Sequence, residues 1–103
     1  MGRMTYSAIP VEIDDRPLRH LEIVIGSKLR RREAFLFSWR ERPEFGSGRG
    51  ALWVAPGVPL RFSYSTHSAG EINERWLRDL EIAANGPRGL GLTAEPAYPP
   101  SRR

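Results

Sequence analysis

The sequence predicts a single α+β domain in which an antiparallel sheet carries two amphipathic helices on one face. Apolar residues recur at helical spacing in two segments, whereas they recur with a period of two in the segments between them. Three strands in succession with short connections favour antiparallel pairing, and two helices with one apolar stripe each need a sheet face to bury it. The expected order is strand, strand, helix, strand, strand, strand, helix, strand.

The first half of the chain predicts two strands and a helix. Residues 4–9 and 11–14 alternate loosely and are joined by a turn near Pro10. Residues 16–31 have an apolar stripe at helical spacing and end in basic residues, which complement the negative end of the helix dipole. This segment is therefore predicted to be the first helix.

The second half predicts three more strands before the second helix. Residues 34–39 alternate with a largely apolar row on each side, as in a strand covered on at least one face. The glycine-rich stretch 40–50 predicts an exposed loop or a hairpin, and residues 51–55 predict the next strand. Residues 60–66 alternate most clearly, and a last strand is expected within 89–96.

Both helices have polar residues that can cap their first turns. Asp14 or Asp15 can accept hydrogen bonds from the free amides of the first helix. For the second helix, Ser68 and Glu71 have the spacing of a capping box, and Asn73 is an alternative start. An Asn-Gly-Pro sequence then ends the helix.

The length and composition are those of one soluble domain, predicted to span residues 1–96 with a flexible tail at 97–103. The chain has no cysteine, which excludes disulfides, thiolate metal ligands and cysteine nucleophiles. It has no apolar run of membrane-spanning length and no signal-peptide pattern, so we expect a cytoplasmic protein.

No pattern in the sequence indicates an active site, so we expect no catalytic residues, no metal and no cofactor. The two histidines, His20 and His67, lack metal-ligand spacing, and His20 is expected on the surface of the first helix. The glycine-rich stretch 46–50 can present backbone amides, but it lacks the Lys followed by Ser or Thr that opens a helix in a phosphate-binding loop. An enzyme is therefore the least favoured class.

The positive charge is the most informative feature for function. The formal net charge is +4, and every basic residue except Lys28 is an arginine, whose planar fork suits phosphates. Codon usage in a GC-rich genome is the favoured explanation of this excess of arginine over lysine. The candidate nucleic-acid-binding residues are Lys28, Arg30, Arg31, Arg40, Arg49 and Arg61. If their strands are neighbours, Arg40, Arg49 and Arg61 share one side of the sheet.

The tryptophans allow two interpretations. Trp39 and Trp53 can provide stacking surfaces for bases, but a core position is favoured for both because they lie in apolar strands. Alternatively, they anchor a homodimer or another protein contact through the open face of the sheet. The leading hypothesis is a non-enzymatic accessory protein that binds nucleic acid through its arginine clusters, and the alternative is a homodimeric protein-interaction module that uses the open face of the sheet.

Most of the chain resembles a family of small proteins of undefined function from actinobacteria and their phages. The resemblance lies in "VEIDDR", "KLRR" and "FLFSW" in the first half and in "LWVAP", "IN", "AN" and "GLTAEP" in the second half. Gly is usual in that family at the position of Arg32, and His is usual at the position of Ala55.

Members of the family often carry the label "ATP-dependent DNA ligase". Ligase chemistry needs a nucleotide-accepting lysine in a Lys-x-Asp-Gly setting and carboxylates for a metal. Lys28, the only lysine, is followed by Leu-Arg-Arg. The resemblance therefore implies at most a DNA-associated accessory role, for example in repair or in a phage.

Overall fold

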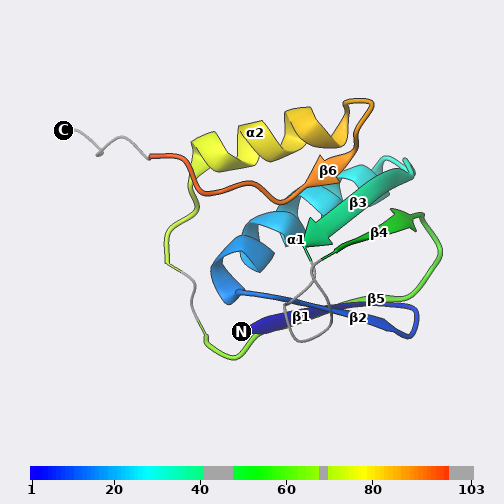
Figure 1. Cartoon of the computed structure of the whole chain (residues 1–103), viewed down its shortest axis with the longest axis horizontal. Helices are drawn as coiled ribbons and strands as arrows, with labels where there is room; N and C mark the ends of the chain where they lie inside the picture. The colour runs from blue at the N-terminus through cyan, green and yellow to red at the C-terminus, as the bar shows by residue number, and fades with distance from the viewer. Residues whose placement is uncertain (41–47, 68–69, 98–103) are drawn as a thin grey trace.

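The computed structural model describes residues 1–40, 48–67 and 70–97, and it confirms the α+β class and the predicted order of elements. Figure 1 shows the whole chain. The elements are β1 (Gly2–Tyr6), β2 (Ile9–Ile13), α1 (Asp15–Arg30), β3 (Phe35–Arg40), β4 (Arg49–Val54), β5 (Leu60–Ser63), α2 (Glu74–Ala84) and β6 (Leu90–Gly91). The turn between the first two strands lies at residues 7–8 rather than near Pro10. Most of the predicted tail lies outside the described residues.

The strands form two three-stranded sheets instead of one. The strand orders are β2-β1-β5 and β4-β3-β6, so β5 pairs with β1 and not with β4. The segment between β4 and β5 turns at Gly57, which has a φ of +88°, and the Ser7 amide donates to the Pro59 carbonyl. These contacts direct β5 to β1. All pairs are antiparallel except β3 with β6, which are parallel.

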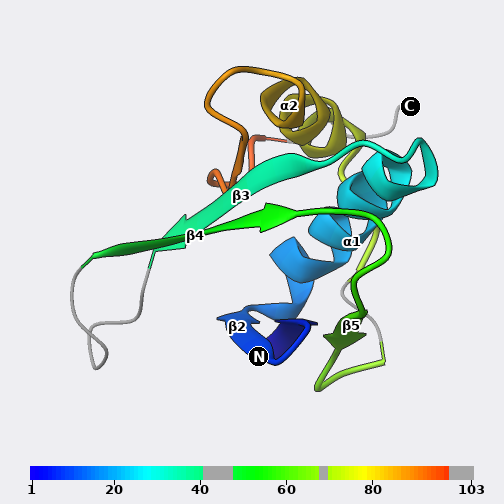
Figure 2. The ribbon, with the colours of Figure 1, turned by 90° about the vertical axis from the view of Figure 1, so that its right-hand side faces the viewer.

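The two helices lie side by side and run in the same direction (Figure 1). At their N-terminal ends His20 of α1 accepts a hydrogen bond from the Asn73 amide before α2. At their C-terminal ends Lys28 of α1 donates to Asn85, the C-cap of α2. Figure 2, turned by 90°, shows β3 and β4 extending together beyond both helices.

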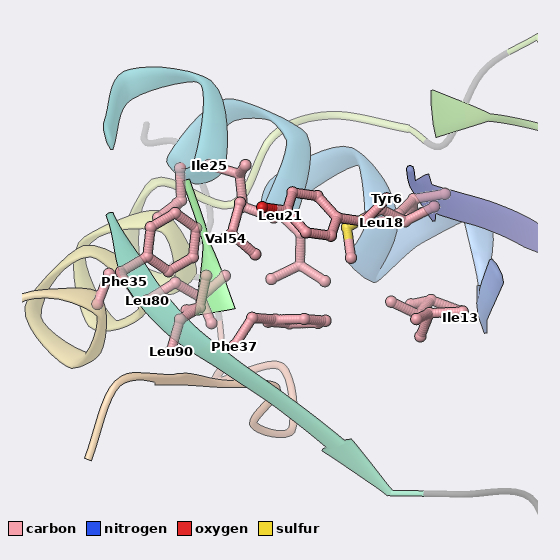
Figure 3. Close-up of a cluster of buried hydrophobic side chains, with 14 of the residues drawn as sticks. Tyr6, Ile13, Leu18, Leu21, Ile25, Phe35, Phe37, Val54, Leu80 and Leu90 are labelled. Carbon is pink, nitrogen blue, oxygen red and sulfur yellow. The ribbon is translucent and has the colours of Figure 1, made fainter. Parts of the chain in front are cut away.

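The hydrophobic core joins both sheets to both helices. Figure 3 shows Phe37 of β3 among side chains from α1, α2 and the other strands. The fully buried large side chains include Met4, Leu18, Leu21, Ile25, Phe37, Leu80 and Leu90. Because this one core takes side chains from both sheets, the described residues form one packed unit. No helix in the described part of the chain is long and apolar enough to cross a membrane.

The helix starts differ from the predictions in one case. Asp14 is the N-cap of α1 but makes no side-chain capping bond, and Asp15 instead accepts hydrogen bonds from Ser65 and Thr66. The α2 helix begins after Asn73, whose side chain accepts from the Trp76 amide, so the predicted alternative at Asn73 is confirmed. Ser68, the other alternative, lies outside the described residues.

The α1 helix ends in a Schellman motif that has an arginine where glycine is preferred. The Glu33 amide donates to the Lys28 carbonyl, and the Arg32 amide donates to the Leu29 carbonyl. This arrangement requires the left-handed conformation at Arg32, which has a φ of 59°. A residue with a Cβ is strained there.

We therefore expect Arg32→Gly to raise the free energy of unfolding by about 1 kcal/mol. Urea denaturation of the variant and the parent protein measures the change. Arg31→Gly is the matched control, because Arg31 has a φ of −85° and gains nothing from glycine. Equal effects of the two substitutions would contradict the strain at Arg32.

Candidate nucleic-acid interface

The β3–β4 hairpin has one face toward the core and one face toward solvent. Directly paired residues of an antiparallel ladder share a face, and the register pairs Leu36 with Trp53, Ser38 with Ala51, and Arg40 with Arg49. The core face carries Phe35, Phe37, Trp39, Leu52 and Val54, which are buried or partly buried. We call the other side the outer face; it carries Leu36, Ser38, Arg40, Arg49, Ala51 and Trp53.

Two arginines lie opposite each other at one end of the outer face. Arg40 and Arg49 are both exposed and are direct partners in the β3–β4 ladder. The Arg49 guanidinium donates to the Ser38 hydroxyl over 2.9 Å. None of the ion pairs among the described residues involves either arginine. Like charges directly opposite each other destabilise a ladder, so an anion bound between them would be stabilising.

The two arginines border a pocket of about 320 Å³, which we call the arginine pocket. Ser38, only 6% exposed, contributes a hydroxyl, and Gly91 and Leu92 lie on the side of β6. The full lining is Ser38, Trp39, Arg40, Arg49, Gly91 and Leu92. Two guanidinium groups and one hydroxyl are all hydrogen-bond donors, and the lining has no carboxylate. The pocket therefore suits an anion.

Trp53 lies at the opposite end of the outer face and is 69% exposed. It is four positions from Arg49 on the same strand and the same face, a separation of about 13 Å. The favoured core position is therefore wrong for Trp53. Trp39 does pack partly buried against the core and stacks on Phe37 with ring centroids 5.6 Å apart.

The remaining candidates on α1 lie apart from the arginine pocket. The Lys28 side chain is only 8% exposed, and its ammonium contacts Glu33 over 3.0 Å and Asn85 over 2.8 Å. Arg31 also pairs with Glu33, whereas Arg30 is exposed. These residues end the helix that precedes β3, so the length of β3 separates them from Arg40. Lys28 therefore joins α1 to Glu33 and Asn85 within the fold and is not available to bind a ligand.

The expectation that Arg61 shares a sheet face with Arg40 and Arg49 is wrong. It required β5 to pair with β4, but β5 pairs with β1, where Arg61 lies opposite Thr5. Arg61 is exposed and lines a separate hollow with the Arg3–Glu12 ion pair. Of the three basic candidates on the strands, the structure therefore brings together two, Arg40 and Arg49.

A buried polar network was missed by sequence reasoning. His20 is fully buried, so its predicted surface position is wrong. Its Nδ1 donates to the Arg16 carbonyl and its Nε2 accepts from the Asn73 amide, both over 2.9 Å, which sets the neutral tautomer. The ring also contacts Trp76, with centroids 4.7 Å apart. His20 thus joins α1 to the start of α2.

Glu95 extends this network to the C-terminal segment. Arg16 forms a bidentate ion pair with Glu95, with both contacts at 2.7 Å, and the Asn73 amide group donates to the same carboxylate. These hydrogen bonds from Arg16 and Asn73 lower the pKa of Glu95 to about 2. All these polar groups bond to each other, which indicates a structural role. Among the described residues no group of three or more His, Asp or Glu residues can hold a metal ion.

The comparisons with known proteins identify a family and no function. A family model described as "Domain of unknown function (DUF7882)" matches residues 1–95. No curated protein and no solved structure matches the chain.

Proposed function

The chain belongs to the DUF7882 family, a domain of unknown function, and we propose that it is a non-enzymatic protein that binds nucleic acid through the outer face of the β3–β4 hairpin. One observation carries the proposal. Arg40 and Arg49 lie side by side without an acidic partner among the described residues, on the same face as the exposed Trp53. Paired cationic side chains near an exposed aromatic ring are typical of surfaces that bind nucleic acid.

The distribution of charge supports this choice of face. Arg3, Arg16, Arg19, Lys28 and Arg31 all form ion pairs within the protein, which satisfies their charge. The two arginines of the pocket have no such pair in the described structure. Other exposed arginines share this property, but Arg40 and Arg49 are also direct cross-strand partners, so they hold two charges together for a phosphate. The resemblance to actinobacterial and phage proteins that carry a DNA ligase label agrees with a DNA-associated accessory role in the cytoplasm.

Replacing both arginines, Arg40→Ser with Arg49→Ser, is expected to remove most of the binding to a short oligonucleotide. Fluorescence anisotropy over a series of salt concentrations measures it. The slope of log K against log salt should become shallower by about 0.7, since the two arginines share one pocket for one phosphate and each lost phosphate contact on a single strand accounts for about that much. The protein should still fold, because both side chains are exposed.

The matched control is Arg75→Ser with Arg78→Ser, which removes the same charge from exposed positions on α2. If both double variants weaken binding equally, binding depends only on the net charge of the protein, and the site is not on the hairpin. If the parent protein binds no oligonucleotide, the proposal is wrong.

A homodimer is the second candidate function, and the 69% exposure of Trp53 is the observation that favours it. Buried tryptophans often dominate protein interfaces. A dimeric mass in light scattering that becomes monomeric in Trp53→Ala, without any oligonucleotide binding by the parent, would establish the homodimer instead.

A further inference from the structure

We infer that the outer face binds a single strand of nucleic acid, with one base stacked on Trp53 and a phosphate in the arginine pocket. This inference rests on the proposed function and narrows it to a class of ligand. Two observations support the inference: the small residues in the middle of the outer face, and the different contacts that the arginines and Trp53 offer at its two ends.

The middle of the face is built from small residues. Ala51 and Ser38 are cross-strand partners there, and Gly91 pairs with Ser38 from the other side. A Cβ placed on Gly91 would lie 3.5 Å from the Ser38 hydroxyl and would make no closer contact. Gly91 therefore has ordinary space around it, and the exposed Ala51 keeps the surface low between the arginines and Trp53, where a ligand can lie along β4.

The two ends of the face offer different contacts. At one end the guanidinium groups of Arg40 and Arg49 match phosphate oxygens, and the hydrogen bond to Ser38 orients Arg49 toward the pocket. At the other end Trp53 presents an exposed indole next to Leu36. An indole binds the flat face of a base, and stacking of this kind accepts any base.

A duplex does not satisfy both ends. In double-stranded nucleic acid the base faces stack on each other, so Trp53 has no free face to contact, and only phosphates and groove edges are presented. An unpaired strand presents a base and a phosphate together. With about 13 Å between Arg49 and Trp53 along β4, one short stretch of strand reaches both.

Binding of oligothymidylate and of a duplex of the same length, measured by fluorescence anisotropy at one low salt concentration, tests this inference. We expect the parent protein to bind the single strand about tenfold more tightly. Trp53→Leu should weaken single-strand binding by about tenfold, the loss of one stacked base, and Trp53→Phe should retain most of it. None of these changes should reduce duplex binding.

Gly91→Leu tests the pocket separately. The new side chain lies beside Ser38 in the lining of the pocket, so it should block the phosphate and weaken single-strand binding, and thermal denaturation of the variant checks that it is folded. Gly86→Leu is the control, since this residue lies in the turn after α2, outside the lining of the pocket.

The possible results separate the two proposals. Equal affinity for both oligonucleotides, with no effect of Trp53→Leu or Gly91→Leu but a loss in the double arginine variant, overturns the single-strand inference and keeps nucleic-acid binding. Absence of binding to either oligonucleotide overturns both. Loss of single-strand binding in all three outer-face variants, with the controls unaffected, supports both.

Discussion

Replacing Gly89 by alanine is expected to lower the free energy of unfolding by about 3 kcal/mol. Gly89 has a φ of +77°, a conformation that strains any residue with a Cβ. Its added Cβ would also overlap the Leu36 carbonyl oxygen and lie 2.8 Å from the Leu36 Cβ. Both atoms belong to the central strand β3, which cannot move without disturbing Phe37. Urea denaturation measures the change.

Gly91→Ala is the control for this prediction, because Gly91 lies two residues further along and has ordinary space around it. We expect this substitution to change stability little. Gly89→Ala should also weaken oligonucleotide binding, since Gly89 places β6 beside β3 and so forms one side of the arginine pocket. Similar stabilities of the two variants would show that β6 is not held as closely to β3 as the structure indicates.

The elements of this fold could be predicted from the sequence because each depends on local periodicity. The stripe of α1 and the alternation of β3 were sufficient to place both elements within about one residue of their observed bounds. Strand pairing depends on contacts far apart in the chain. The pairing of β5 with β1 brings Leu60 beside Tyr6, and no local pattern in either strand records it. The division into two sheets was therefore not predictable.

The alternation of residues along β4 indicates in the sequence that Trp53 is exposed. Arg49, Ala51 and Trp53 alternate with Gly50, Leu52 and Val54. Because a strand has a period of two, Trp53 must share a face with Arg49. A face with a charged residue is the one exposed to solvent. Residues 51–54 are all apolar, so this segment alone does not distinguish a buried face from an exposed one, and it favours a core position for Trp53.

Two polar residues of α1, His20 and Lys28, are buried because they face the two ends of α2. His20, Val24 and Lys28 are four residues apart and form one line along the helix, and all are buried. Polar residues normally indicate the solvent side of a helix. Here the two ends of the line bond to Asn73 and Asn85, which flank α2. The polar partners could not be identified before the helices were placed side by side.

Replacing Asn73 by alanine is also expected to lower the free energy of unfolding by about 3 kcal/mol. Asn73 is fully buried, and its Oδ1 caps α2 while its Nδ2 donates to Glu95 and to the Pro96 carbonyl. Loss of the cap costs about 1 kcal/mol, and the lost hydrogen bonds to the Glu95 carboxylate, which keeps Arg16 as a donor, and to the Pro96 carbonyl cost about 1 kcal/mol each. Asn73→Ser keeps a capping oxygen and should lose only part of this stability in urea denaturation.

The pH dependence of stability gives Asn73→Ala a second readout that an ordinary cavity would not change. Because the folded-state pKa of Glu95 is lowered to about 2, its contribution is present above its usual pKa near 4.5 and is lost as the pH falls from there toward 2. Asn73 is one of the two donors that lower this pKa, the other being Arg16. Without it the pKa of Glu95 rises, so the variant should lose less stability over that pH range than the parent protein. Parallel losses in the two proteins would show that the Asn73 side chain does not act on the Glu95 carboxylate.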